Sequence, residues 1–217
     1  MRYAVVAAVL LVTAAAVAVA VARGGPSPEP GEPAAGPATG ASSPAASTST
    51  RAELDLSDLP IARAPFCPLV DDDEVSEALD ADIDGTDSYE PGDTVRVAPG
   101  VRDVAHEYIC SFEGSGAEAR VWVFAAPVST PRARGLVREL RGEQGCEAAP
   151  TGTTYGTPGL TRVCTGDGEV EASLRGLFGD TWLTCQVTDR SGADDAQAVE
   201  SRADRWCVHV ATTLGAR

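Results

Sequence analysis

Four aspartates near the first third of the chain have a spacing that could bind a cation. Residues 80–87 read Asp-Ala-Asp-Ile-Asp-Gly-Thr-Asp, which repeats the alternating carboxylates and the glycine that open a calcium-binding loop. The match is incomplete, because Asp87 replaces an apolar residue of such loops and Pro91 replaces their bidentate glutamate. The sequence leaves two interpretations open: a solvated acidic loop, or a weak calcium site formed by Asp80, Asp82, Asp84 and Asp87. No other cofactor is predicted.

A second group with potential chemistry is a row of arginines. Arg134, Arg138 and Arg141 follow one another at helical spacings of four and three residues, with Arg132 nearby. On a helix they form one basic stripe, and guanidinium groups bind carboxylates and phosphates in a forked geometry. The stripe could therefore bind an anionic partner. The alternative, which we favour, is a solvated helix face whose arginines pair with Glu139 and Glu143 or with the acidic segment of the same chain.

Six cysteines are the most informative residues for the redox state of the protein. They stand at positions 67, 110, 146, 164, 185 and 207, an even number downstream of a segment that predicts export. Disulfides are the expected state of such a set, and fifteen pairings are possible. Adjacency in the sequence favours Cys67–Cys110, Cys146–Cys164 and Cys185–Cys207. A zinc site is not expected, since no Cys-x-x-Cys spacing occurs.

No arrangement in the sequence predicts catalysis. There is no Gly-x-Ser-x-Gly motif, and a catalytic triad would have to use His106 or His209. A carboxylate pair could still act in a cleft, because so many acids make some pair inevitable. Trp122, Trp182 and Trp206 are interpreted as packing residues rather than as a platform for sugars.

The charge balance excludes several functions. The 217 residues contain 32 acidic and 17 basic side chains, which gives a formal net charge of −15. Such a surface repels phosphate backbones, so nucleic-acid binding is not expected. All basic residues are arginine, and the lack of lysine excludes a phosphate-loop lysine and a Schiff base.

The periodicity of apolar residues predicts the elements that position these groups. The final helix is the clearest, because its apolar residues form one stripe from Ala196 to Leu214 and include Cys207. We predict earlier helices over 71–80 and from Pro131 to an end near Gly142 to Gly145, and strands over 94–98, 106–113, 118–126, 160–165, 169–177 and 181–188. The order α-β-β-β-α-β-β-β-α, with short turns between strands, predicts a disulfide-stabilised α+β domain with an antiparallel sheet backed by helices.

The N-terminal part predicts export and membrane attachment. Residues 3–22 carry no charge and are long enough to cross a bilayer, so residues 1–22 are either an uncleaved anchor or a cleaved signal peptide. Residues 23–54 are rich in Pro, Ala, Ser and Thr and predict a disordered tether. Residues 55–217 then form an extracytoplasmic domain.

Two short motifs carry a resemblance to known proteins. The string Cys67-Pro68-Leu69-Val70, followed by the helix 71–79, resembles the opening of small actinobacterial envelope families, many of them lipoproteins of unknown function. Cys110-Ser111-Phe112 belongs to the same pattern. The domain also looks like the extracytoplasmic sensor domains of actinobacterial receptor kinases. The resemblance implies a disulfide-bonded α+β fold with a cleft and no catalytic residues; a lipid anchor does not carry over, since no cysteine precedes Cys67.

Taken together, the sequence predicts a non-catalytic binding domain of the cell envelope, whose partner is a protein or a small ligand. The alternative is a secreted or surface enzyme acting through carboxylates in a cleft. The two classes differ in the site they need, because an enzyme requires titratable groups that converge in a pocket.

Overall fold

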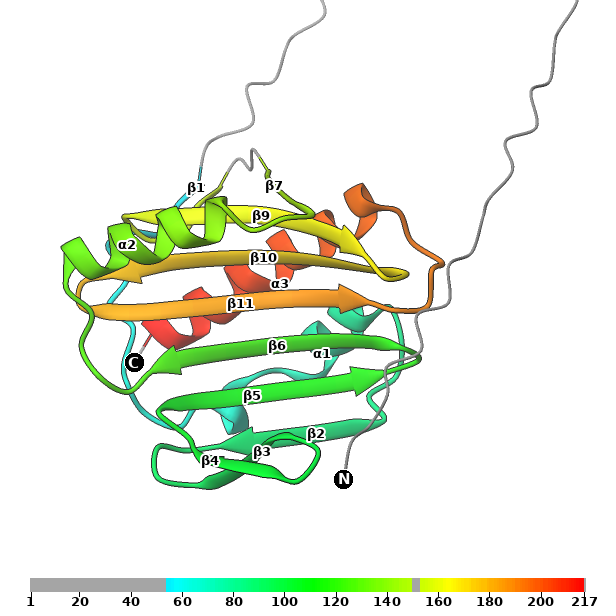
Figure 1. Ribbon diagram of the computed structural model, residues 1–217, viewed down its shortest axis with the longest axis horizontal. Coiled ribbons are helices and arrows are strands. Elements are labelled where there is room, and N and C mark those ends of the chain that lie inside the picture. The colour runs from blue at the N-terminus through cyan, green and yellow to red at the C-terminus, as the bar shows by residue number, and fades with distance from the viewer. Residues whose placement is uncertain (1–53, 150–152, 217) are drawn as a thin grey trace, which may run out of the picture. The chain divides into compact units, whose positions relative to one another are not determined.

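The computed structural model describes residues 54–149 and 153–216 (Figure 1). The predicted membrane segment 3–22 and nearly all of the predicted tether lie outside these ranges. The first strand begins at Leu54, one residue before the predicted start of the domain. Within the described residues no helix has the length and apolar character needed to span a membrane.

The domain is built on one seven-stranded antiparallel sheet with the strand order β2-β5-β6-β11-β10-β9-β7. Tight turns join its central strands, because Ser115-Gly116 and Asp167-Gly168 all adopt positive φ, as two-residue hairpin turns require. The strands are β2 (Gly85–Tyr89), β5 (Glu107–Gly114), β6 (Ala117–Phe124), β7 (Cys146–Ala148), β9 (Gly159–Gly166), β10 (Glu169–Phe178) and β11 (Thr181–Asp189).

Two helices cover one face of this sheet and enclose the main core. The helix α1 (Asp72–Leu79) begins at the cap Asp71, and α3 (Ala196–Gly215) begins at the cap Asp195; each cap carboxylate accepts a backbone N–H of the first turn. The apolar stripe of α3 packs against inward-facing leucines and valines of β10 and β11, and α1 packs against β6. This antiparallel sheet backed by helices confirms the predicted α+β fold class.

The other face of the sheet is only partly covered. The helix α2 (Thr130–Arg141), capped by Ser129, crosses over β9 and β10 and buries Ala133 and Val137 against the sheet (Figure 1). In the described part of the chain no helix covers this face over β2, β5 and β6 (Figure 1). The sheet therefore has a partly uncovered face beside α2.

Three disulfides form, with the pairing that adjacency favours. Cys67 bonds Cys110, Cys146 bonds Cys164, and Cys185 bonds Cys207. The third joins the sheet to α3 in the centre of the core, where both cysteines are fully buried. The second joins the edge strands β7 and β9.

The structure corrects the predicted elements in two places. The strand predicted over 94–98 is β3 (Thr94–Ala98), but it pairs with β4 (Val101–Val104) in a separate two-stranded sheet. The edge of the main sheet is instead β2, a polar strand that sequence patterning does not reveal. Short elements complete the fold: η1 (Cys67–Leu69) and the parallel pair β1 (Leu54–Asp55) and β8 (Thr153–Thr154).

Candidate functional site

The strongest candidate site is a pocket of about 540 Å³ between α2 and the open part of the sheet, which we call the α2 groove. Aromatic rings and leucines make up its floor and wall, and charged groups stand at its rim. Its lining residues are Trp122, Phe124, Leu136, Arg138, Glu139, Leu140, Gly142, Glu143, Arg175, Trp182 and Thr184. Small-molecule sites have this composition, mostly apolar with a few polar groups, and this range of volumes.

The register of the sheet explains why these side chains meet. Trp122 of β6 lies opposite Thr184 of β11, which in turn lies opposite Arg175 of β10. Directly opposite residues of antiparallel strands project from the same face, so the three line one row across the floor. Trp182, two residues before Thr184, is buried under α2, whereas Trp122 is half-buried and borders the pocket.

A chain of alternating charges connects Arg175, which lines the floor, to Arg162 and two glutamates. Arg162 pairs with Glu143 of the loop after α2 and with Glu171, and Glu171 also pairs with Arg175 at 3.3 Å. The Arg175 guanidinium lies 5.7 Å from the centroid of the Trp122 ring, within the range of a cation–π contact. Burial and the neighbouring Arg162 lower the pKa of Arg175, and the hydrogen bond from Arg162 lowers the pKa of Glu143. These groups neutralise one another and hold the floor rigid.

Arg138 is the cation at the groove that this chain of charges leaves unpaired. Glu139 pairs with Arg132, as expected for the arginine stripe, whereas Glu143 pairs with Arg162 of the sheet instead. Among the described residues, Arg134, Arg138 and Arg141 have no carboxylate partner, and all three are exposed. The structure places only Arg138 in the α2 groove; Arg141 borders a separate pocket of about 370 Å³.

The four aspartates of the calcium hypothesis are not gathered into one site. Asp80 ends α1 in a left-handed conformation, Asp84 accepts the backbone N–H of Ser115, and Asp87 lies within β2. The extended strand β2 begins at Gly85, where a calcium loop would turn, so it carries Asp87 along the sheet edge. Across residues 54–149 and 153–216, no group of three or more His, Cys, Asp or Glu side chains could hold a metal ion. Calcium binding stays a prediction without support from this geometry.

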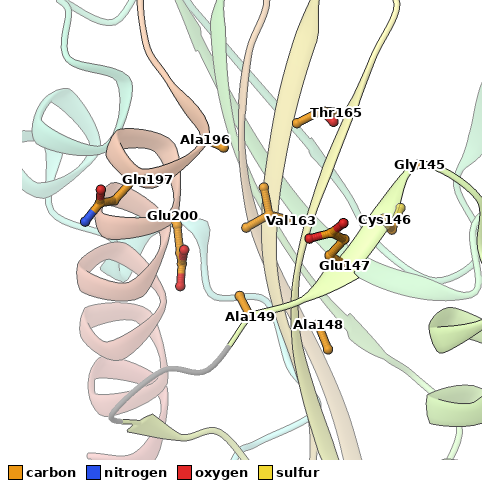
Figure 2. Close-up of a pocket in the computed structure, with 10 residues that line it drawn as sticks. All are labelled: Gly145, Cys146, Glu147, Ala148, Ala149, Val163, Thr165, Ala196, Gln197 and Glu200. Atoms are coloured by element: carbon orange, nitrogen blue, oxygen red, sulfur yellow. The ribbon is translucent and has the colours of Figure 1, made fainter.

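A second, larger pocket of about 790 Å³ lies between the edge strands and the start of α3 (Figure 2). Its lining comes from β7, β9 and the first turns of α3, and its charged groups are Glu147 and Glu200. Figure 2 shows no aromatic ring among its lining residues, which include Cys146, Val163 and Gln197. Glu147 and Glu200 have no cation beside them among the lining residues, and on an acidic protein two such carboxylates do not favour a particular ligand. This pocket is therefore the weaker candidate.

The most buried carboxylates of the sheet are held in their ionised form. Glu118 accepts hydrogen bonds from Ser111 and Arg190 and pairs with Arg120 at 2.8 Å. Burial by itself would raise the pKa of Glu118, but Arg190, Arg120 and Ser111 together outweigh it and lower that pKa. A general acid needs a raised pKa instead. Glu118 is therefore suited to a structural role and not to acid catalysis in the carboxylate enzyme that the sequence leaves as an alternative.

The groove residues include some that sequence reasoning assigned elsewhere. Trp122 and Trp182 were predicted to pack between elements, which holds for Trp182 and only in part for Trp122. Alternation along residues 117–124 does place Trp122 and Phe124 on one face. What alternation cannot show is that α2 stops short of covering that face.

Comparisons with known proteins give weak similarities. No family model matches the chain, and no curated protein matches its sequence significantly. The extracellular domain of PknH from Mycobacterium tuberculosis aligns with a TM-score of 0.40 and 11% identity, over 70% of this chain and 98% of that one. A GTP binding regulator from Thermotoga maritima aligns with a TM-score of 0.32 and 10% identity, over 72% and 95%. Similarity of this size assigns no function.

Proposed function

We propose that the protein is a non-catalytic extracytoplasmic domain that binds a small ligand in the α2 groove. The observation that carries the proposal is the coincidence of an aromatic floor, formed by Trp122 and Phe124, with the unpaired Arg138 at the rim of one pocket. An apolar face of a ligand would lie on the rings, and an anionic group would accept hydrogen bonds from the guanidinium.

The location outside the cytoplasm is supported by the cysteine chemistry. All six cysteines are paired in disulfides, which persist in oxidising compartments. The uncharged segment 3–22 predicts the export that such a location requires.

An aromatic anion can test the groove directly. We expect 1-anilinonaphthalene-8-sulfonate to bind, and Arg138→Ala to weaken this binding about tenfold, as expected for the loss of a charge-assisted hydrogen bond at a partly exposed site. Trp122→Ala should weaken it at least as much, because stacking area is lost. The measurement is a fluorescence titration at low ionic strength.

Arg134→Ala is the matched control, since Arg134 lies on the same helix, is exposed, and does not line the groove. It should leave the dye affinity within about twofold of wild type. Near-ultraviolet circular dichroism should show the same folded state in all variants. Equal weakening by Arg134→Ala and Arg138→Ala, or none by either, would refute the groove as the binding site.

A further inference from the structure

The β3–β4 hairpin is an apolar projection with no role in the core. Among the residues that the structure describes, its strands pair only with each other, and none of its residues belongs to either core cluster. Of the five exposed large hydrophobic side chains in the described residues, three lie on this hairpin: Val97, Val101 and Val104, with exposed fractions of 58%, 51% and 46%. Figure 1 places the hairpin beyond β2, at the edge of the sheet opposite α2.

Two arginines stand directly behind the apolar tip. The tip reads Val97-Ala98-Pro99-Gly100-Val101, and Arg96 and Arg102 flank it. These arginines form one cross-strand pair, so both project from the same face of the hairpin. Residues 94–102 contain no acidic side chain, although the whole chain carries a net charge of −15.

The arginine pair is unfavourable in the free protein. Like charges directly opposite each other destabilise a β ladder, and neither arginine has a carboxylate partner among the described residues. The nearest acid, Asp103, pairs with Val95 on the alternate face, and its carboxylate accepts the N–H of Val104. A phosphate between the two guanidinium groups would relieve the repulsion.

We propose that the β3–β4 hairpin docks on an anionic phospholipid bilayer, with the tip valines in the boundary of the acyl chains and Arg96 and Arg102 on lipid phosphates. Arg96 and Arg102 each lie three residues from Pro99 at the end of the hairpin, which is about 10 Å at roughly 3.3 Å per strand residue. That spacing matches an apolar tip buried about 5–10 Å deep, with its cations at the headgroups.

A bilayer is favoured over a protein partner because the chain itself carries a predicted membrane segment, which would hold the domain near a bilayer. Residues 3–22 predict a membrane segment, and a linker of about 30 residues could extend roughly 90 Å. Attachment keeps the hairpin at a high local concentration near lipid, so a weak contact suffices.

Hydrogen exchange on the full chain in lipid nanodiscs tests the proposal. We expect the amides of residues 94–104 to exchange about tenfold more slowly in nanodiscs that contain phosphatidylglycerol than in nanodiscs of phosphatidylcholine alone. The double variant Val97→Asp/Val101→Asp should abolish this protection, and Arg96→Ser/Arg102→Ser should reduce it to the level seen in phosphatidylcholine. These side chains are exposed and outside the core, so the fold should survive.

The control is Arg134→Ser/Arg205→Ser, which changes the net charge equally at two exposed arginines outside the hairpin. It should keep the protection at the wild-type level. Three results would overturn the proposal: exchange that does not depend on phosphatidylglycerol, protection that persists in the aspartate variant, or equal loss in the control. Protection by an added soluble envelope fraction alone would assign the hairpin to a protein partner instead.

Discussion

Replacing Cys185 and Cys207 together with alanine should lower the free energy of unfolding by about 4–5 kcal/mol. The bond closes a separation of 22 residues, which contributes about 3 kcal/mol through the unfolded chain. Both sulfurs are also fully buried between β11 and α3, so their removal leaves a cavity that costs about 1–2 kcal/mol more. Denaturation in guanidinium chloride, followed by circular dichroism at neutral pH, measures the change.

The matched control is the pair Cys146→Ala/Cys164→Ala at the edge of the sheet. Its separation of 18 residues is similar, so the chain-entropy contribution is again about 3 kcal/mol. Both cysteines are partly exposed, however, and their removal opens no closed cavity. Equal losses in the two variants would show that packing around Cys185 and Cys207 adds nothing to the bond.

The elements with strong local signals could be predicted from the sequence. The final helix is an example, because its apolar stripe repeats over five turns and faces a single core. The strands joined by Ser115-Gly116 and Asp167-Gly168 are others, since the turn residues and the alternation agree. Adjacency predicts the cysteine pairing best where a bond joins neighbouring elements, as Cys146–Cys164 joins β7 to β9 and Cys185–Cys207 joins β11 to α3, whereas Cys67–Cys110 spans 43 residues.

The elements without local signals could not be predicted. The strand β2 carries Asp87 and Ser88 and few apolar residues, and it is a strand because β5 offers a free edge. That pairing is a property of the tertiary structure, and it converts a segment with the spacing of a calcium loop into extended backbone. The opposite holds for the predicted strand 94–98, because its valines alternate as in a core strand, but Val97 is exposed and Val95 only partly buried on the β3–β4 hairpin.

The α2 groove depends on long-range geometry in the same way. Its floor combines residues from β6, β10 and β11, which meet only because these strands are neighbours in the sheet. The stripe of arginines and the pairing of Glu139 with Arg132 could be predicted from the sequence, but the partner of Glu143 could not. Arg162, which pairs with Glu143 in place of an arginine of the stripe, lies 19 residues after Glu143 in the sequence.

Arg202→Met should destabilise the domain by about 3–5 kcal/mol at neutral pH. Arg202 on α3 pairs with Asp189 at 3.1 Å and with Asp194 at 2.7 Å, and it donates to the carbonyl of Ala78 on α1. Both Arg202 and Asp189 are almost completely buried, so the variant leaves an ionised carboxylate in the interior without its cation. Arg132→Met, which breaks the exposed pair with Glu139, is the control and should cost less than about 1 kcal/mol.

The loss caused by Arg202→Met should depend on pH. In the wild type, burial alone would raise the pKa of Asp189, but hydrogen bonds from Ser191 and Arg202 lower it below its usual value of 3.8. The stabilisation from this group is therefore complete above about pH 4 and is lost as pH falls through the lowered pKa. Without the Arg202 cation, burial raises the pKa of Asp189. The stability difference between the variant and the wild type therefore becomes smaller as the pH falls and the Asp189 carboxyl is protonated.

Asp189→Asn in the Arg202→Met background should recover part of the lost stability at pH 7, because it removes the buried charge. A deficit that stays constant from pH 7 to about pH 4, with no recovery in the double variant, would mean that Arg202 acts through packing rather than through its charge.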